Sequence, residues 1–265
     1  MKASLFGLAI KDLSDGAQRW ELASFWGVDD VRQRYARTLF GPFWLVIVAG
    51  VWIGSLGFVM SALLGSNMTA ALPHLACGMI LWIYFSAMLN EGADIVVANQ
   101  FNIQNTSLPF SIYVYRYAVR NIVIFLHYLP IIIGVLLVCR VTPTLQILLF
   151  IPGFVLLTLS GVGLGVAIGF LVARYRDARQ LLTAVLQVLP LLTPIIWDDR
   201  FLPADKRWVA EYNPLHHLIS VARDPLIGRA LEGQSWLIAV AVTVAGLLIG
   251  FVSLSLHRKR CTFWL

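Results

Sequence analysis

The chain has 265 residues, of which 59% are hydrophobic and only 13% are charged. A water-soluble domain carries about 25% charged residues, because a surface that faces water needs charge and a surface that faces lipid does not. The composition therefore excludes an ordinary soluble domain. The net charge of +6 has to be interpreted by its distribution along the chain, and by itself it does not indicate nucleic-acid binding.

Long uncharged segments divide the chain into candidate membrane spans. The run from Thr38 to Asn90 contains no charged residue and is too long for one span, because a bilayer core needs about 20 apolar residues of helix. A polar break at 65–69 splits this run into two spans, and four later uncharged runs supply four more. We therefore predict an all-α integral membrane protein with six transmembrane helices, at about 39–64, 73–98, 117–138, 145–173, 181–197 and 236–256.

The basic residues are distributed asymmetrically. If the N-terminus is cytoplasmic, 14 of the 20 Lys and Arg residues fall on the cytoplasmic side of the predicted spans. An excess of Lys and Arg in short loops marks the cytoplasmic side of a membrane protein. We therefore expect both termini to be cytoplasmic and the segment 198–235 to lie outside.

The ends of the chain flank this transmembrane domain, which covers 39–256. Residues 1–38 are polar and basic, and the stretch from Trp20 to Arg37 has a helical pattern with tryptophan and arginine. Such basic amphipathic helices commonly lie in the membrane interface, so we predict an interface helix here, with docking to a partner as the alternative. Residues 257–265 form a basic cytoplasmic tail.

The outer segment 198–235 is too long for a tight turn and too charged to span a membrane. Asn213 and Pro214 form a good helix start, because Asn caps helices and Pro suits the first helical position. The apolar residues that follow share one helical face: Leu215, Leu218, Ile219, Ala222 and Leu226. We predict one or two short helices in or on the outer leaflet.

Glycines recur at four-residue spacing in the predicted fourth span, at Gly161, Gly165 and Gly169. Small residues at this spacing let two membrane helices approach closely. We therefore predict a helix-packing face here and no nucleotide site.

Two acids, Glu91 and Asp94, lie on one face near the inner end of the second span. Acids within a span are candidate functional residues. The second span is predicted to start at Pro73, and the length of helix from there to Glu91 places these two acids at the membrane interface. They form either an interfacial or salt-bridged pair, or a gate or substrate contact.

The sequence shows no catalytic or metal-binding motif. No Gly-Lys pair occurs anywhere, so the phosphate loop of ATP-hydrolysing proteins is missing and we expect no cofactor in this chain. His216 and His217 are adjacent, so on a helix they point about 100° apart and cannot share one metal ion. We expect no metal site.

Aromatic residues are frequent in the first two spans. Trp and Tyr are common in the belts at membrane interfaces, but Trp52 falls near mid-span, where a belt explains it poorly. Aromatic faces also stack on sugar rings, so a carbohydrate path is the alternative. Its candidate residues are Trp52, Phe58, Trp82, Tyr84 and Phe85.

Four motifs occur in a particular order. They are a basic segment from Asp30 to Trp44; Tyr175-Arg176-Asp177 with Gln187 and Thr193-Pro194-Ile195; Asn213-Pro214-Leu215 with Arg223 and the turn at 225–228; and the terminal Phe263-Trp264-Leu265. In order and spacing the chain resembles the polysaccharide-exporting permeases of the ABC-2 class, which move O-antigen, capsule or teichoic chains.

The resemblance implies the transmembrane subunit of an ABC transporter that exports a lipid-linked polysaccharide across a bacterial inner (plasma) membrane. It implies a homodimer with a channel between the subunits, and a separate subunit that binds ATP and Mg and hydrolyses ATP. Residues 198–235 would form re-entrant outer gate helices, with Asn213, Pro214, Leu218 and Arg223 among them. Contacts with the ATPase subunit would involve Arg32, Arg34, Tyr35, Arg37, Phe101, Asn102, Ile103 and Gln104.

Two other classes remain open. An ABC-2 exporter of a drug or small lipid would share the fold and most of the motif order. A membrane glycosyltransferase or acyltransferase would need clustered acids or a His-Asp pair at a membrane face, and Glu91 with Asp94 is the one candidate.

Overall fold

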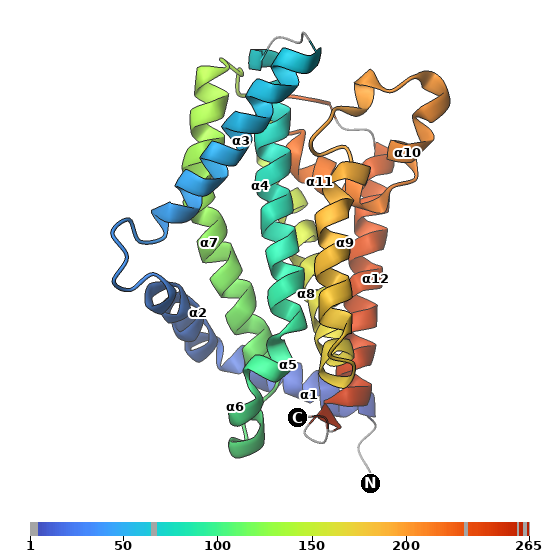
Figure 1. The fold of residues 1–265 in the computed structure, drawn as a ribbon. Coiled ribbons are helices and arrows are strands. Elements are labelled where there is room, and N and C mark those ends of the chain that lie inside the picture. Colours follow the sequence, from blue (N-terminus) through green and yellow to red (C-terminus); the bar gives the residue numbers. More distant parts are fainter. Residues whose placement is uncertain (1–4, 65–67, 231–232, 259, 262–263, 265) are drawn as a thin grey trace.

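The computed structural model describes residues 5–64, 68–230, 233–258, 260–261 and 264. Phe263 and Leu265 of the terminal aromatic motif lie outside the described residues, as does most of the polar break at 65–69. In the described part every regular element is a helix, as predicted (Figure 1).

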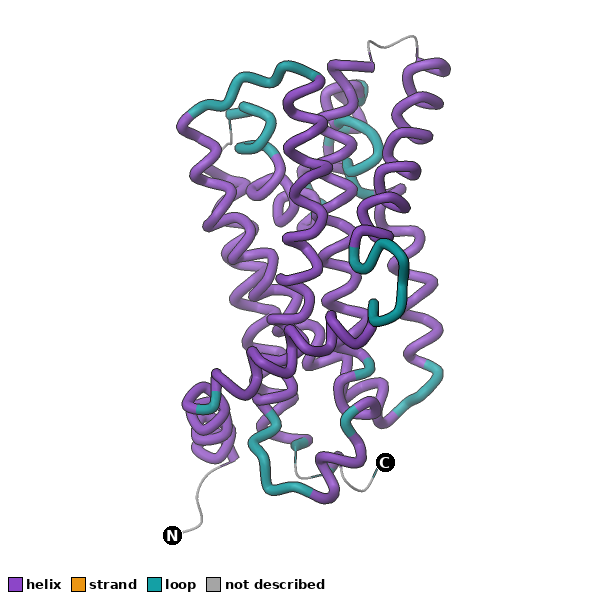
Figure 2. Tube along the Cα trace, turned by 90° about the vertical axis from the view of Figure 1, so that its left-hand side faces the viewer, coloured by secondary structure: helices purple, strands orange, loops and turns teal. Residues whose placement is uncertain are grey.

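Among the described residues, five helices are long and apolar enough to cross a membrane. They are α3 (Phe43–Leu64), α4 (Met68–Ala93), α7 (Ser111–Val138), α8 (Phe150–Arg174), which is extended at its start by a short 3-10 helix (Leu145–Leu149), and α12 (Gly233–His257). Figure 2 shows them running along one elongated bundle, with both termini at the same end. Five of the six predicted spans are therefore confirmed.

The sixth apolar helix, α9 (Ala178–Leu192), is shorter than the span predicted at 181–197. Its 15 residues rise about 22 Å, less than the roughly 30 Å of a bilayer core. The helix ends because Pro194 disfavours helical geometry in the residue before it, and Thr193 is accordingly extended, with φ −103° and ψ 141°.

Other predicted boundaries shift for local reasons. The second span breaks at Asp94, after which the short helices α5 (Ile95–Ala98) and α6 (Gln100–Asn105) follow. The first span begins at Phe43 instead of residue 39, because Arg37 and Gly41 adopt left-handed backbone conformations with φ of 65° and 55°. The third span begins at Ser111, six residues earlier than predicted.

The helix α4 lies at the centre of the bundle and α3 at its edge. Of the apolar stretch of α4, 72% is buried, compared with 17% for α3. The helix α8 packs between α4 and α12, and glycines allow both approaches. A Cβ at Gly165 would lie 3.3 Å from the Cα of Gly92, and one at Gly163 would lie 2.5 Å from the carbonyl oxygen of Gly246. The predicted helix-packing role of the glycines is thus confirmed.

Two helices precede the spans. The predicted interface helix is α2 (Trp20–Arg34), which buries the small residues Ala23 and Gly27 against α7 and leaves Trp20 and Phe25 exposed. The helix before it, α1 (Leu5–Gln18), was not predicted. It lies at the end of the bundle that carries the termini (Figure 1).

The carboxylate of Asp12 anchors α1 at the start of α7. It accepts hydrogen bonds from the backbone N–H groups of Ser111 (2.9 Å) and Phe110 (3.1 Å), and it pairs with Arg258 after α12 at 3.0 Å. A negative charge at a helix N-terminus is favoured by the helix dipole, so this contact also helps to define the early start of α7.

The outer segment lies at the opposite end of the bundle from the termini (Figure 1). It consists of two 3-10 turns (Asp199–Phe201 and Ala204–Lys206), α10 (Trp208–Glu211) and α11 (Pro214–Arg223). The helix α11 packs against α4, α8 and α12, and its residues from His216 to Arg223 are all buried. The predicted short helices are present, with α11 inserted among the long helices.

Candidate functional site

A groove of about 600 Å³ runs between α3, α4 and α9. Trp52 of α3 and Trp82 of α4 both line it, so the structure brings together two of the residues predicted for a carbohydrate path. Trp52 is 60% exposed, whereas Trp82 is 5% exposed. The rest of the lining is mostly apolar, and Ser86 and Gln187 add polar groups. The groove can therefore offer the exposed ring of Trp52 together with a few hydrogen-bonding groups.

The other three residues predicted for this path do not line the groove. Phe58 is exposed elsewhere on α3, while Tyr84 and Phe85 are buried inside the chain. The hydroxyl of Tyr84 lies 2.8 Å from the hydroxyl of Thr158, and its ring packs 4.9 Å from that of Phe154. These contacts make Tyr84 part of the contact between α4 and α8.

Towards the end of the bundle that carries the termini, Glu91 of α4 bonds to two other helices. Its carboxylate accepts from Arg34 of α2 at 2.9 Å, from Arg120 of α7 at 2.7 Å and from the amide of Asn121 at 2.6 Å. Arg34, which was predicted to contact the ATPase subunit, is thus held by this chain, although its side chain remains 44% exposed.

The same network continues to Asp30 of α2. Asp30 pairs with Arg116 at 2.6 Å and with Arg120 at 3.1 Å, and the side chain of Asp30 is only 15% exposed. Arg116 also lies over the ring of Trp26, 5.4 Å from its centre. The helix α2 is therefore fastened to α4 and α7 by a shared set of charges.

Asp94 makes a separate pair with Arg179 of α9 at 2.9 Å. Arg179 also donates to the side chain of Asn90 at 2.6 Å. Glu91 and Asp94 are both salt-bridged, as the first of the two interpretations predicted.

The remaining residues predicted for the ATPase contact lie at two places. Arg32 and Arg37 are exposed at the end of α2 and just after it, and Tyr35 between them is half-buried. Phe101 on α6 is 76% exposed, at the end that carries the termini (Figure 1). Next to it Asn102 and Ile103 are half-buried, and Gln104 is exposed.

At the end of the bundle opposite the termini, α11 starts as predicted. The side chain of Asn213 accepts from the N–H of Leu215 at 3.0 Å and donates to the hydroxyl of Thr193 at 3.1 Å. Pro214 occupies the first turn, and Leu218 is fully buried. The cap thus joins the start of α11 to the end of α9.

Arg223 at the end of α11 is 1% exposed. Its guanidinium donates to the carbonyl of Pro194 at 2.7 Å and to Asp224 at 2.7 Å, and it lies 3.3 Å from Nε2 of His74 on α4. A buried cation without such partners would be strongly unfavourable, so these contacts hold α11 in place.

Beside Arg223, a further outer cluster surrounds Asp198. Its carboxylate bonds Arg229 at 2.6 Å and Arg200 at 2.7 Å, and lies 3.8 Å from His74. Burial alone would raise the pKa of Asp198, but the hydrogen bond from Arg200 and the neighbouring positive charges lower it overall. The carboxylate is therefore ionised. The sequence interpretation did not identify His74, Asp198 or Arg229.

The family described as ABC-2 type transporter matches residues 28–227, which is most of the chain. The chain belongs to the ABC-2 type transporter family. Two curated proteins from Klebsiella pneumoniae, each named O-antigen export system permease protein RfbA, are 23% identical over 234 residues, which is 87% of this chain and 88% of each relative.

Membership of the ABC-2 family confirms the resemblance inferred from the motifs and the prediction of a transporter membrane subunit. The matched residues begin within α2 and end just after α11. They include the groove, both sets of inner ion pairs and the contacts of Arg223. The helices α1 and α12 lie outside the matched part of this ABC-2 chain.

Proposed function

We propose that this ABC-2 chain is the permease subunit of an exporter that moves a lipid-linked polysaccharide, such as O-antigen or capsule, across the bacterial inner (plasma) membrane. The observation that carries the proposal is the alignment, over nearly the full length of both proteins, with two relatives named as O-antigen export permeases. The groove lined by Trp52 and Trp82 supports it, because aromatic faces can stack on sugar rings and apolar walls can accommodate lipid.

In this proposal a separate ABC subunit binds ATP and Mg and supplies the energy. The absence of a Gly-Lys pair from the sequence supports this division of labour, since the usual phosphate loop requires one. The exposed Phe101 on α6 offers an apolar contact at the end that carries the termini. A homodimer would cover the exposed face of α3.

The topology that we propose has six membrane crossings, both termini in the cytoplasm, and α10 and α11 as re-entrant outer gate helices. The helix α8 ends at the end of the bundle that carries the termini, and α11 lies near the opposite end (Figure 1). The chain between them must cross the bundle, so α9 together with the turn residues after it serves as the fifth crossing.

Affinity purification tests the partner. The tagged chain, extracted from its native membrane, is expected to retain a nucleotide-binding subunit, and Phe101→Asp is expected to lose it. Tyr212→Asp is the matched control, because Tyr212 is also an exposed aromatic (82%) but lies at the other end of the bundle. Equal retention by both variants would contradict the proposed role of α6.

Surface glycan measurements test the substrate. Trp52→Ala and Trp82→Ala are each expected to lower the amount of polysaccharide at the cell surface while the complex still assembles. Trp82→Phe keeps the buried volume more nearly filled and separates loss of the indole from loss of folding. Unchanged surface glycan in all three variants would reject the carbohydrate path and favour the exporter of a drug or small lipid.

A further inference from the structure

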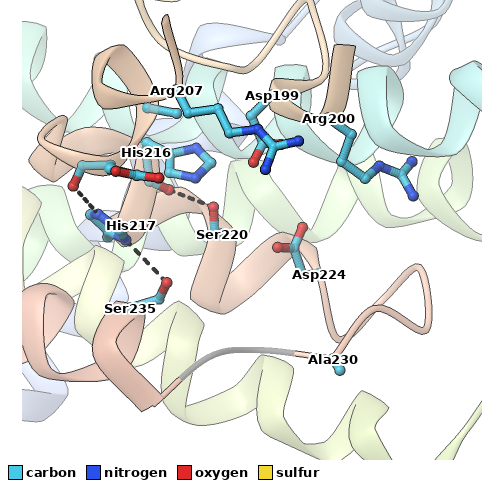
Figure 3. Close-up of a pocket in the computed structure, with 11 residues that line it drawn as sticks. Asp199, Arg200, Arg207, His216, His217, Ser220, Asp224, Ala230 and Ser235 are labelled. Carbon is cyan, nitrogen blue, oxygen red and sulfur yellow. Dashed lines mark hydrogen bonds between the residues drawn. The ribbon is translucent and has the colours of Figure 1, made fainter. Parts of the chain in front are cut away.

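A second cavity, of about 310 Å³, lies at the outer end of the chain between α10, α11 and the start of α12 (Figure 3). Its polar lining includes Arg207, Glu211, His216, Asp224 and Ser235. This volume is at the lower end of the range of about 300–1,000 Å³ for small-molecule sites.

Most charges around this outer pocket neutralise one another. Arg200 is paired with Asp198, and Asp224 holds the guanidinium of Arg223. Three charged lining residues form no ion pair within the described residues, and of Arg207, Glu211 and Asp199 only Arg207 is basic. The pocket therefore has no excess of positive charge to select a phosphate or another anion.

Asp199 also lines the pocket. Burial and the neighbouring Asp198 raise the pKa of Asp199. Within the described residues, no group of three or more His, Cys, Asp or Glu side chains is placed to hold a metal ion. A cation is thus not favoured either.

One buried polar atom in the wall lacks a partner. His216 is only 9% exposed, and its Nδ1 forms no hydrogen bond within the described part of the chain. Its neighbour His217 has both ring nitrogens engaged, with the hydroxyl of Ser235 at 3.0 Å and the carbonyl of Glu211 at 2.8 Å. Because buried polar groups are nearly always hydrogen-bonded, the unpaired Nδ1 of His216 leaves hydrogen-bonding capacity in a residue of the pocket wall.

The combination of groups matches one ligand class. Carboxylates accept hydrogen bonds from hydroxyls, the guanidinium of Arg207 donates to them, and the imidazole of His216 can do either according to its tautomer. We propose that the outer pocket binds about one or two neutral sugar units. This inference rests on the proposed function, in which these sugars belong to the exported glycan at the side where it leaves.

Binding to the purified full-length chain in lipid nanodiscs tests the inference. The probes are methyl glycosides of neutral hexoses and delipidated oligosaccharides released from the cell's own surface polysaccharide, followed by saturation-transfer NMR. Glu211→Ala and Arg207→Ala are each expected to weaken binding about tenfold. Ala230→Trp, which places a large side chain in the lining, is expected to abolish binding. Lys206→Ala is the matched control, because this exposed cation is adjacent to Arg207 but outside the lining.

Binding that is unchanged in all three pocket variants, no binding by the unmodified chain, or binding of inorganic phosphate in place of sugars would overturn the inference. Failure of the sugar pocket and failure of the proposed export function give different results. If deleting the chain blocks surface glycan but the pocket variants bind and export normally, only the sugar pocket is rejected. If glycosides bind in the expected variant pattern while deletion leaves surface glycan intact, the export function is rejected and the sugar site remains.

Discussion

Replacing Glu91 by Gln is expected to loosen the attachment of α2 to the bundle. The carboxylate of Glu91 accepts hydrogen bonds from Arg34, Arg120 and Asn121 at 2.6–2.9 Å. Gln has nearly the same shape and keeps one acceptor oxygen, but it lacks the charge that compensates the two arginines. The variant therefore tests the charge of this residue and leaves its volume unchanged.

The expected loss of stability lies between the values for exposed and buried pairs. Exposed ion pairs contribute about 0–1 kcal/mol, and removing one partner of a fully buried pair costs about 3–5 kcal/mol. The side chains of Glu91 and Arg120 are 17% and 19% exposed, but Arg120 keeps Asp30 as a partner and Arg34 can be hydrated. We expect a loss of about 2 kcal/mol, or about 4–8 °C in Tm by the scaling of soluble domains.

The assay is thermal unfolding of the purified protein in detergent, followed by tryptophan fluorescence. Asp94→Asn is the matched control on the same helix, because Asp94 and its partner Arg179 are 47% and 33% exposed and should contribute less than about 1 kcal/mol. High salt should weaken the Asp94 pair more than the less exposed Glu91 network. A Tm shift for Glu91→Gln no larger than that of Asp94→Asn would refute this reasoning.

Three further predictions concern packing, the first helix and pH. Gly163→Leu is expected to prevent folding, because the new Cβ would lie 2.5 Å from the carbonyl oxygen of Gly246. Gly134→Leu should be tolerated, since nothing lies within 4 Å of a Cβ at that position. Gel filtration after detergent extraction measures how much folded protein each variant yields. Asp12→Asn is expected to lower the stability of the α1 attachment by about 1–2 kcal/mol, because the cap of α7 is weakened. The loss should be seen as faster proteolysis of α1. Asp15→Asn is the control and should be cleaved at the rate of the unchanged protein. Burial, followed by the charge of Arg223, lowers the pKa of His216 to about 3. The unfolded chain therefore binds the extra proton first, and stability should fall by up to about 1.4 kcal/mol per pH unit as the pH drops from about 6.5 towards 3. A slope unchanged by His216→Gln would contradict that assignment.

The features that were predicted correctly from the sequence depend on residues close together in the chain. Uncharged runs revealed five spans, glycine spacing revealed the contacts of α8, and the pair Asn213-Pro214 revealed the start of α11. The early end of α9 was also encoded locally, in the effect of Pro194 on Thr193. The prediction of a longer span gave too much weight to the absence of charge.

The features that were missed depend on contacts between distant segments. The helix α1 has only a short apolar stretch of its own, and it is secured by Asp12, whose partners on α7 lie 98 and 99 residues away. Similarly, His74 meets Arg229 across 155 residues. Trp52 and Trp82 were both candidates, but only the packing of α3 against α4 shows that they line one groove.

Deleting the gene for this chain tests the central claim most directly. We predict that surface polysaccharide disappears, that its lipid-linked precursor accumulates on the cytoplasmic side of the membrane, and that a plasmid copy of the chain restores export. A deletion strain with normal surface polysaccharide and no accumulated precursor would contradict the account.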